Sequence, residues 1–399
     1  MKNELINKYS PIYGSPFMTW IFMWVNAISD SALYVDWPDC NFYRSDMIYR
    51  THDLFSSIKS PSENTRLYFS WVMPNKMVTW YDDKISRKLK FIENNDNFNV
   101  WFVTCMPVTS LLWIQYDNIF TDLNKKKYIF IKSFTDKFRL DWYSLFLREI
   151  AKNIDLNENK IKEDKSISII WFLFDRNEWD CFWNIEEIKR ILLLFWIKLD
   201  TIWLNWWKFD NLKQVENSSL IVSLPYWEMA SKVLSNRLWV DYISTSIPFW
   251  INQTIKFIKD ITIKLWIDEK IVNEILANEL NFIKSKTNFL YEKAFIWKTY
   301  IYSWDENLLD WIKDIWNYYW FIFKESYFYN WTKESDFKID NDVNIVIWNS
   351  AFNMWWEKTI KFEFGFPSYN KHFILNRPFM WFKWFLNFSE DLYNSLFEF

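Results

Sequence analysis

The sequence predicts an α/β protein built on parallel sheets, and three observations support this fold class. Short runs of β-branched and aromatic residues alternate with amphipathic stretches along the whole chain, which is the pattern of parallel α/β layers. Most of the short runs are followed by a turn signal and then by helical periodicity. Half of the 399 residues are apolar, so we expect a chain that buries substantial cores.

The predicted strands are short apolar runs bounded by turn residues, as expected for buried parallel strands. They comprise Ala32–Val35, Leu67–Phe69, Val100–Thr104, Tyr128–Ile131, Ser168–Phe174, Lys198–Ile202, Leu220–Ser223, Tyr242–Thr245, Lys298–Tyr302, Phe321–Lys324 and Val343–Ile347.

The predicted helices have apolar residues at spacings of three and four. They comprise Lys84–Asn94, Tyr143–Asn153, Ile185–Phe195, Glu228–Leu238, Thr254–Leu265, Glu269–Phe289, Glu306–Tyr318 and Phe382–Phe397.

Two features divide the chain into domains. The segment Asn157–Lys165 is charged and nearly free of apolar residues, so it is predicted to be an exposed connection. The long helix Glu269–Phe289 precedes a new strand and helix pattern that starts at Lys298. We therefore predict three domains, at 1–160, 161–290 and 291–399.

Charge and hydropathy limit the expected binding partners and the expected cellular compartment. The net charge of -3 and the pI near 5.7 provide no broad basic field, so we do not expect nucleic-acid binding. No stretch approaches the ~18 uninterrupted apolar residues of a membrane span, and the first residues lack the apolar core of a secretion signal. The three cysteines, Cys40, Cys105 and Cys181, are too few and too odd in number for a disulfide framework. A cytoplasmic protein without a membrane partner is the expectation.

The balance of glycine and tryptophan is unlike that of an ordinary protein. The chain has 2 glycines and 30 tryptophans, whereas glycine usually makes up about 7% of residues. Together the two residue types account for about 8% of this chain, which is an ordinary glycine content. Many tryptophans also stand in turn-like contexts, among them Asp36-Trp37-Pro38, Asn205-Trp206-Trp207-Lys208, Trp348-Asn349-Ser350 and Met354-Trp355-Trp356-Glu357.

Our hypothesis is that the gene comes from a genome that reads UGA as glycine, and that the sequence was translated with UGA as tryptophan. Richness in Asn, Lys, Ile and Phe agrees with an AT-rich genome. The alternative is a genuinely aromatic-rich protein that binds a solute or a sugar through tryptophan. The hypothesis predicts tryptophans at positive φ or with exposed rings, first of all Trp37, Trp207, Trp348 and Trp356.

Two segments end a predicted strand with a cysteine. The first runs from Ala32 to Cys40 and is predicted to present the thiol at the tip of a tight turn, and the second is Val103-Thr104-Cys105. Thiols at the carboxyl ends of neighbouring strands could converge on one iron-sulfur cluster. Buried free cysteines are common, however, so the spacing alone leaves a purely structural role open.

These two segments resemble the component 1 family of nitrogenases, which includes the dark-operative protochlorophyllide reductases. Members carry one cluster cysteine in a His-Gly-Pro-x-Gly-Cys turn and another in a Thr-Cys segment that leads to Ile-Gly-Asp-Asp. Asp36-Trp37-Pro38-Asp39-Cys40 is similar to the turn, with Asp36 in place of histidine and Asp39 in place of the second glycine. Val103-Thr104-Cys105 followed by Leu112–Asp117 is similar to the second motif in a degraded form.

The resemblance extends over most of the chain. The segment from Leu224 through Ser246–Ile251 to Thr254 is similar to a family stretch with Pro-x-Gly and a downstream threonine. Trp348-Asn349-Ser350, Phe364-Gly365-Phe366-Pro367 and Met380–Trp384 are similar to the closing Gly-Asn-Ser, Gly-Phe-Pro and Gly-Tyr-x-Gly motifs. The resemblance implies three Rossmann-like parallel-sheet domains of the nitrogenase component 1 type.

For the site, the resemblance implies that Cys40 and Cys105 are metal ligands and that Asp36, Trp37 and Pro38 form the cofactor-binding turn. The family commonly has an earlier cluster cysteine, which is missing here from Ser10–Ser15. Because two thiols do not complete the Cys₄ ligation of a [4Fe-4S] cluster, we expect the cluster to be shared between subunits.

Other departures from the family pattern change the substrate and the acid catalyst that we expect. Residues Leu220–Ile251 contain no cysteine, and Cys181 is expected to be incidental in a loop, so dinitrogen reduction is not expected and an organic substrate is favoured. His52 and His372 are the only histidines. His372, which follows the Gly-Phe-Pro segment, is the better candidate for a general acid, although an isolated histidine is more often structural.

The predicted function is therefore an electron-accepting oxidoreductase subunit, which reduces a small-molecule substrate. No Gly-Lys-Ser/Thr phosphate loop occurs even with glycine restored, so ATP hydrolysis is assigned to an iron-protein reductase partner, as the resemblance implies. A homologous or identical component 1 subunit is the second partner. Two alternatives stay open: a non-catalytic scaffold for metallocluster or tetrapyrrole assembly, and a tryptophan-rich solute-binding or sugar-binding α/β protein.

Overall fold

The structure of the chain is a computed structural model. It describes residues 28, 30–38, 67–72, 81–95, 98–105, 116–121, 123, 127–132, 139–170, 179–203, 208–224, 227–248, 250–292, 298–302, 322–327, 345–349, 360–364, 377–378 and 380–397. The predicted helix Glu306–Tyr318 lies outside these residues.

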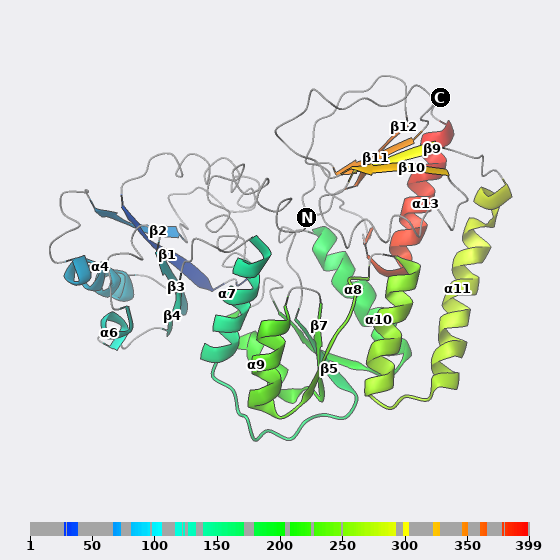
Figure 1. The fold of residues 1–399 in the computed structure, drawn as a ribbon. Helices are drawn as coiled ribbons and strands as arrows, with labels where there is room; N and C mark the ends of the chain where they lie inside the picture. The colour runs from blue at the N-terminus through cyan, green and yellow to red at the C-terminus, as the bar shows by residue number, and fades with distance from the viewer. Residues whose placement is uncertain are drawn as a thin grey trace. The chain divides into compact units, whose positions relative to one another are not determined.

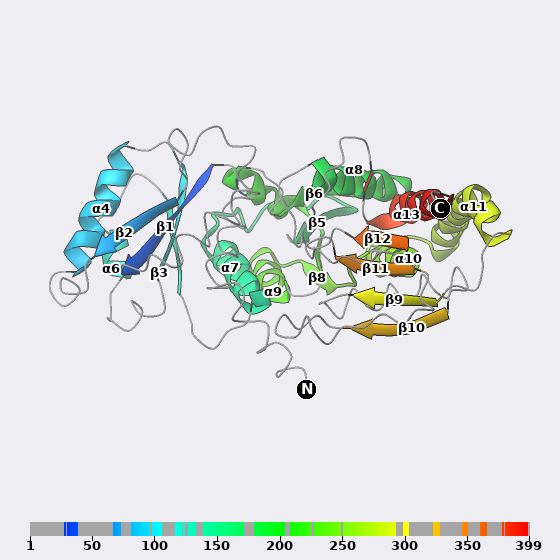
Figure 2. The same cartoon turned by 90° about the horizontal axis from the view of Figure 1, so that it is seen from above.

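Three four-stranded sheets form the framework, and all have the same strand order along the chain (Figures 1 and 2). In each sheet the second strand lies at one edge, followed by the first, third and fourth strands: β2-β1-β3-β4, β6-β5-β7-β8 and β10-β9-β11-β12. The first and third sheets are parallel at each pair of strands for which the register is known. The predicted α/β fold class with parallel sheets is therefore confirmed.

The first sheet consists of β1 (Ser31–Pro38), β2 (Leu67–Val72), β3 (Val100–Cys105) and β4 (Lys127–Ile131). Its strands alternate between two faces, so that Tyr34, Trp101 and Val103 pack beneath α4 (Tyr81–Asn95) and α6 (Tyr116–Thr121) in one cluster. The intervening residue Phe102 faces the other way, and its ring lies 4.8 Å from that of Phe146 in α7 (Arg139–Asn153). Helices therefore cover both faces, as expected for a parallel sheet.

Residue contacts divide the chain into two compact units, of which the first comprises 1–164, 168–173 and 200–242. Besides the first sheet it holds most of β5 (Ser166–Ile170), β6 (Lys198–Ile202), β7 (Leu220–Ser223) and α9 (Glu228–Leu238). The guanidinium of Arg237 in α9 donates to the Ala151 and Ile154 carbonyls at 2.7 and 2.9 Å. It thereby caps the carboxyl end of α7, which packs beside α9 (Figure 1).

The second unit comprises 165–167, 174–199 and 243–399. It holds α8 (Trp179–Leu194), α10 (Ile251–Lys264), α11 (Glu269–Glu292) and α13 (Trp381–Phe397), and α13 packs against the other three helices. Its sheet consists of β9 (Lys298–Tyr302), β10 (Ile322–Tyr327), β11 (Ile345–Asn349) and β12 (Ile360–Phe364). Each of the three predicted domains contains the greater part of one sheet, but the boundaries at 160 and 290 stay a prediction.

The remaining elements are η3 (Phe209–Asn217) and β8 (Asp241–Ser244). Residues 157–161, in the predicted connection, are all exposed. No helix in the described part of the chain is long and apolar enough to cross a membrane.

Tryptophan occupies helix-end positions that usually belong to glycine. Of the five residues other than glycine with positive φ in the described chain, four are tryptophans: Trp196, Trp239, Trp266 and Trp381. Trp196 and Trp266 follow α8 and α10 at φ of 56° and 54°. In both cases the next residue, Ile197 or Ile267, donates back to a carbonyl of the last turn at 3.0 Å. This is the Schellman geometry, in which glycine is the common residue.

Two of the positions named from the sequence do not lie in positive-φ turns. Trp37 and Trp348 lie in β1 and β11, paired in register with Trp71 and Glu363, and neither has positive φ. Both tryptophans have neighbours that are typical of turns, but the strands extend to Pro38 and Asn349. Trp207 and Trp356 lie outside the described residues.

Candidate functional site

The two cysteine segments emerge from neighbouring parallel strands at the same edge of the first sheet. In the register of β1 and β3, Val35 lies opposite Thr104 and Asp36 lies opposite Cys105. Cys105 is the last residue of β3, and Pro38 is the last residue of β1. The backbone therefore brings the start of the Asp36–Pro38 segment beside the residue that carries the second predicted ligand.

This edge coincides with the point where the strand order reverses. In the order β2-β1-β3-β4 the chain leaves β1 to form β2 on one side and then crosses to form β3 on the other. Ligands of open α/β sheets bind outside the carboxyl ends of the strands at this switch point. The carboxyl ends of β1 and β3 are therefore the position in the first sheet where a ligand is expected.

A buried hydroxyl fixes the end of β3 directly before the cysteine. The Thr104 side chain is fully buried, and its Oγ1 donates to the carbonyl of Ile131 at 2.8 Å. Ile131 is the last residue of β4 and lies opposite Thr104 in the register. The hydroxyl thus joins the carboxyl ends of β3 and β4 one residue before Cys105.

The structure describes some of the predicted site residues, whereas others lie outside the described part of the chain. Asp36, Trp37 and Pro38 are the last three residues of β1, so the predicted tight turn does not begin before Pro38. Cys40 and His372 lie outside the described residues, and their roles stay predictions. Cys181 lies in α8, so its predicted place in a loop was wrong. Its neighbours Trp179 and Asp180, which suggested a turn, form the first residues of that helix.

The donor set fits an iron-sulfur cluster only if more than one chain contributes. Within the described residues no group of three or more His, Cys, Asp or Glu side chains is placed to hold a metal ion. The sequence has three cysteines, of which Cys105 ends β3, and this number is smaller than the Cys₄ ligation of a [4Fe-4S] cluster requires. A cluster held at this edge therefore needs ligands from a second subunit.

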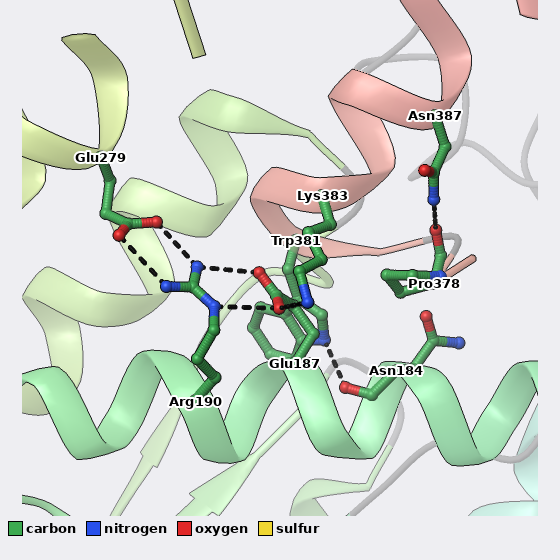
Figure 3. Close-up of polar contacts among 8 residues, drawn as sticks. All are labelled: Asn184, Glu187, Arg190, Glu279, Pro378, Trp381, Lys383 and Asn387. Atoms are coloured by element: carbon green, nitrogen blue, oxygen red, sulfur yellow. Dashed lines mark hydrogen bonds and ion pairs between the residues drawn. The ribbon is translucent and has the colours of Figure 1, made fainter. Parts of the chain in front are cut away.

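A second cluster of functional groups, which the sequence reading missed, lies among the helices of the second unit (Figure 3). The side chain of Glu187 on α8 is fully buried and accepts from Arg190 Nη2 at 2.9 Å and from Lys383 Nζ on α13 at 3.0 Å. Arg190 also donates to both carboxylate oxygens of Glu279 on α11, at 3.1 and 2.7 Å. Glu187 thus connects α8 with α13, and Arg190 connects α8 with α11.

Electrostatics within this cluster favour the charged form of Arg190. Burial alone would lower the pKa of Arg190, but the hydrogen bonds that it donates to Glu279 and Glu187 outweigh burial and raise the pKa above its usual value. The guanidinium is therefore always a cation here, and its fork matches the two carboxylates. The arrangement is that of a structural tie between helices.

We expect Glu187→Gln to lower the free energy of unfolding by roughly 1–2 kcal/mol, because it weakens hydrogen bonds to two charged donors. The figure is below the ~3–5 kcal/mol of fully buried pairs, since the side chains of Arg190 and Lys383 are 36% and 39% exposed. Urea denaturation measures the change. The matched control is Glu186→Gln, whose exposed pair with Lys189 has the same i,i+3 spacing and should contribute below about 0.5 kcal/mol. Equal losses in both variants would contradict the assignment.

The fold and the position of the candidate site define the class of protein. Three sheets in the order second, first, third and fourth strand, with helices covering the first sheet on both faces, form a set of Rossmann-like α/β domains. The carboxyl ends of β1 and β3 lie side by side at the switch point of the first sheet.

Comparison with known structures specifies the fold further. The chain is similar to nitrogenase Cp1 at pH 6.5, with a TM-score of 0.69, 14% sequence identity, and coverage of 95% of this chain and 91% of that chain. It is also similar to nitrogenase Cp1 at pH 5, with a TM-score of 0.63, 9% identity, and coverage of 94% and 88%. No protein-family model and no curated protein sequence matches. The protein thus has the nitrogenase component 1 fold, as predicted.

Proposed function

We propose that this chain is a nitrogenase-like component 1 subunit, an oxidoreductase that receives electrons from an ATP-dependent iron-protein reductase and reduces a small organic molecule. The observation that carries the proposal is the register of β1 and β3, in which Asp36 lies opposite Cys105 at the switch point of the first sheet. The nitrogenase component 1 fold, shared over 95% of the chain, agrees with it.

Cys40 and Cys105 would hold an iron-sulfur cluster, [4Fe-4S], together with ligands from an identical or homologous subunit. When bound, the cluster supplies one-electron transfer. Asp36 and the two residues after it would form the wall of that site, and Thr104 would keep Cys105 in position through its bond to Ile131. His372 would donate a proton to the substrate. A reducing cytoplasm would keep the thiols free for ligation.

The recoding of UGA as glycine is part of the proposal. Trp196, Trp239 and Trp266 combine a left-handed backbone with rings that are 65%, 87% and 93% exposed. A left-handed backbone favours glycine over any residue with a Cβ, and exposed indoles at helix ends provide no core packing. These positions support glycine in the natural protein and disfavour the tryptophan-rich solute-binding alternative.

Reductase-dependent turnover tests the proposed function. The chain is produced anaerobically with glycine at the tryptophan codons, mixed with an iron-protein reductase and MgATP, and followed by electron paramagnetic resonance. We expect an iron-sulfur signal that changes only when both the reductase and ATP are present. Iron without any reductase-dependent change would instead support the scaffold for metallocluster or tetrapyrrole assembly, and absence of iron would refute both.

A further inference from the structure

We propose that the first turn of α10 binds the carboxylate of a small aromatic ligand when residue 250 is glycine. The inference rests on the proposed reading of tryptophan as glycine, and it names a class of substrate for the proposed function. The residues that carry it all belong to the second unit: Ser246, Trp250, Thr254 and two phenylalanines of α13.

The amino end of α10 is suited to an anion. The helix is 14 residues long, its N-cap residue Trp250 makes no side-chain capping hydrogen bond, and its first turn contains no acidic residue. The backbone N–H groups of a first turn have no acceptor within the helix, and the helix dipole adds a partial positive charge there. A carboxylate or phosphate accepts hydrogen bonds from these N–H groups and is attracted by the partial positive charge.

An independent observation is a buried hydroxyl that lacks a partner. Thr254 is fully buried, and its Oγ1 has no hydrogen-bond partner among the described residues. Because Cα–Cβ bonds in a helix tilt toward its amino end, this side chain lies over the turn that begins at Trp250. Ser246 Oγ, on the segment that leads into α10, is buried without a partner in the same part of the chain. A buried hydroxyl without a partner costs about 1–3 kcal/mol, so both oxygens favour a ligand.

The ring of Trp250 shows the shape of the space at this helix end. It is 1% exposed, and its centroid lies 4.7 Å from that of Phe385 and 5.6 Å from that of Phe388 on α13. The two chain segments are tied together, because the backbone N–H of Trp381 donates to the carbonyl of Pro248 at 2.8 Å. Figure 1 shows the ends of α10 and α13 side by side.

With glycine at position 250, the volume that the indole ring occupies beside α13 would be empty. Glycine is an accepted N-cap residue, whereas tryptophan is not among the preferred ones. An empty cavity costs about 24 cal/mol per Å³, so a ligand that fills the space is favoured. Phe385 and Phe388 would contact its apolar body, while the helix end and Thr254 would bind its anionic end. An aromatic carboxylate combines these properties.

Titration calorimetry with benzoate and its neutral analogue benzamide tests the inference on the full chain. We expect no benzoate binding to the unmodified chain, and we expect Trp250→Gly to bind benzoate at least about tenfold more tightly than benzamide. Thr254→Val in the Trp250→Gly background should reduce this preference for benzoate and leave benzamide binding unchanged. If Trp250→Gly does not fold, Trp250→Ala vacates nearly the same volume.

Equal binding of benzoate and benzamide would reveal a cavity without an anion site and overturn the inference, as would no binding to a folded variant. Iron content measured on the same preparation tests the cluster separately. The mass of the protein from its native source tests the recoding separately. Failure of the ligand site is therefore distinguishable from failure of the proposed function.

Discussion

Cys40→Ala is expected to remove most of the iron from the anaerobically isolated protein. In the proposed site the chain supplies two thiols, those of Cys40 and Cys105, so loss of one removes half of its contribution to the cluster. Changes outside the ligand set already reduce metal affinity by about 10–100-fold, and removal of a thiolate ligand should exceed that range. Iron analysis and the visible absorption of the cluster measure the loss.

The third cysteine provides the matched control for this prediction. Cys181 lies in α8 of the second unit, and Cys181→Ala should leave the iron content unchanged. Cys105→Ala should behave like Cys40→Ala, because both residues are proposed ligands of the same cluster and Cys105 ends β3, which pairs in register with β1. Unchanged iron in the Cys40→Ala protein would remove the cluster from this edge. Equal losses in all three variants would point to a general effect on folding.

Much of the fold could be predicted because the periodic signals are strong. The bounds of β6, β7, β9 and α9 agree with the prediction residue for residue. Helix α11 was predicted from Glu269, and its last turn continues to Glu292. Helix ends vary with local capping, which explains why the bounds are less predictable than the elements themselves.

Three elements were missed for identifiable reasons. The helix α6 and the 3-10 helix η3 are short, and short elements have weak periodicity. The strand β12 carries the alternating run Ile360-Lys361-Phe362-Glu363-Phe364, which is a clear strand signal. The signal was therefore present in the sequence.

The two sites differ in how much of their structure could be predicted from the sequence. The expected convergence of the cysteine segments rests on general topology, because parallel strands end at one edge and ligands bind where their order reverses. The ion cluster around Glu187 does not follow from such a rule. Its i,i+3 pair with Arg190 is visible in the sequence, but Glu279 lies 89 residues beyond Arg190. Lys383 on α13 reaches the same carboxylate only through packing of the helices.

Replacing Trp196, Trp239 and Trp266 together with glycine is expected to raise the free energy of unfolding by about 3 kcal/mol. Each position has a left-handed backbone, which costs a residue with a Cβ about 1–2 kcal/mol. Part of the gain is lost because glycine gives the unfolded chain more freedom, so we expect roughly 1 kcal/mol per site. The sites end different helices and should add nearly independently. Urea denaturation of the triple variant measures the sum.

Two controls separate the backbone from the exposed ring. Trp239→Ala removes the indole but keeps a Cβ at φ 55°, so it should recover little of the gain of Trp239→Gly. Phe282→Gly removes an exposed aromatic ring from within α11, where glycine should lower stability by about 0.5–1 kcal/mol relative to a good helix former. If Trp239→Ala stabilises as much as Trp239→Gly, exposure of the ring is the cause and the argument for glycine at these helix ends fails. If only glycine stabilises, the backbone itself specifies glycine at positions where the sequence has tryptophan.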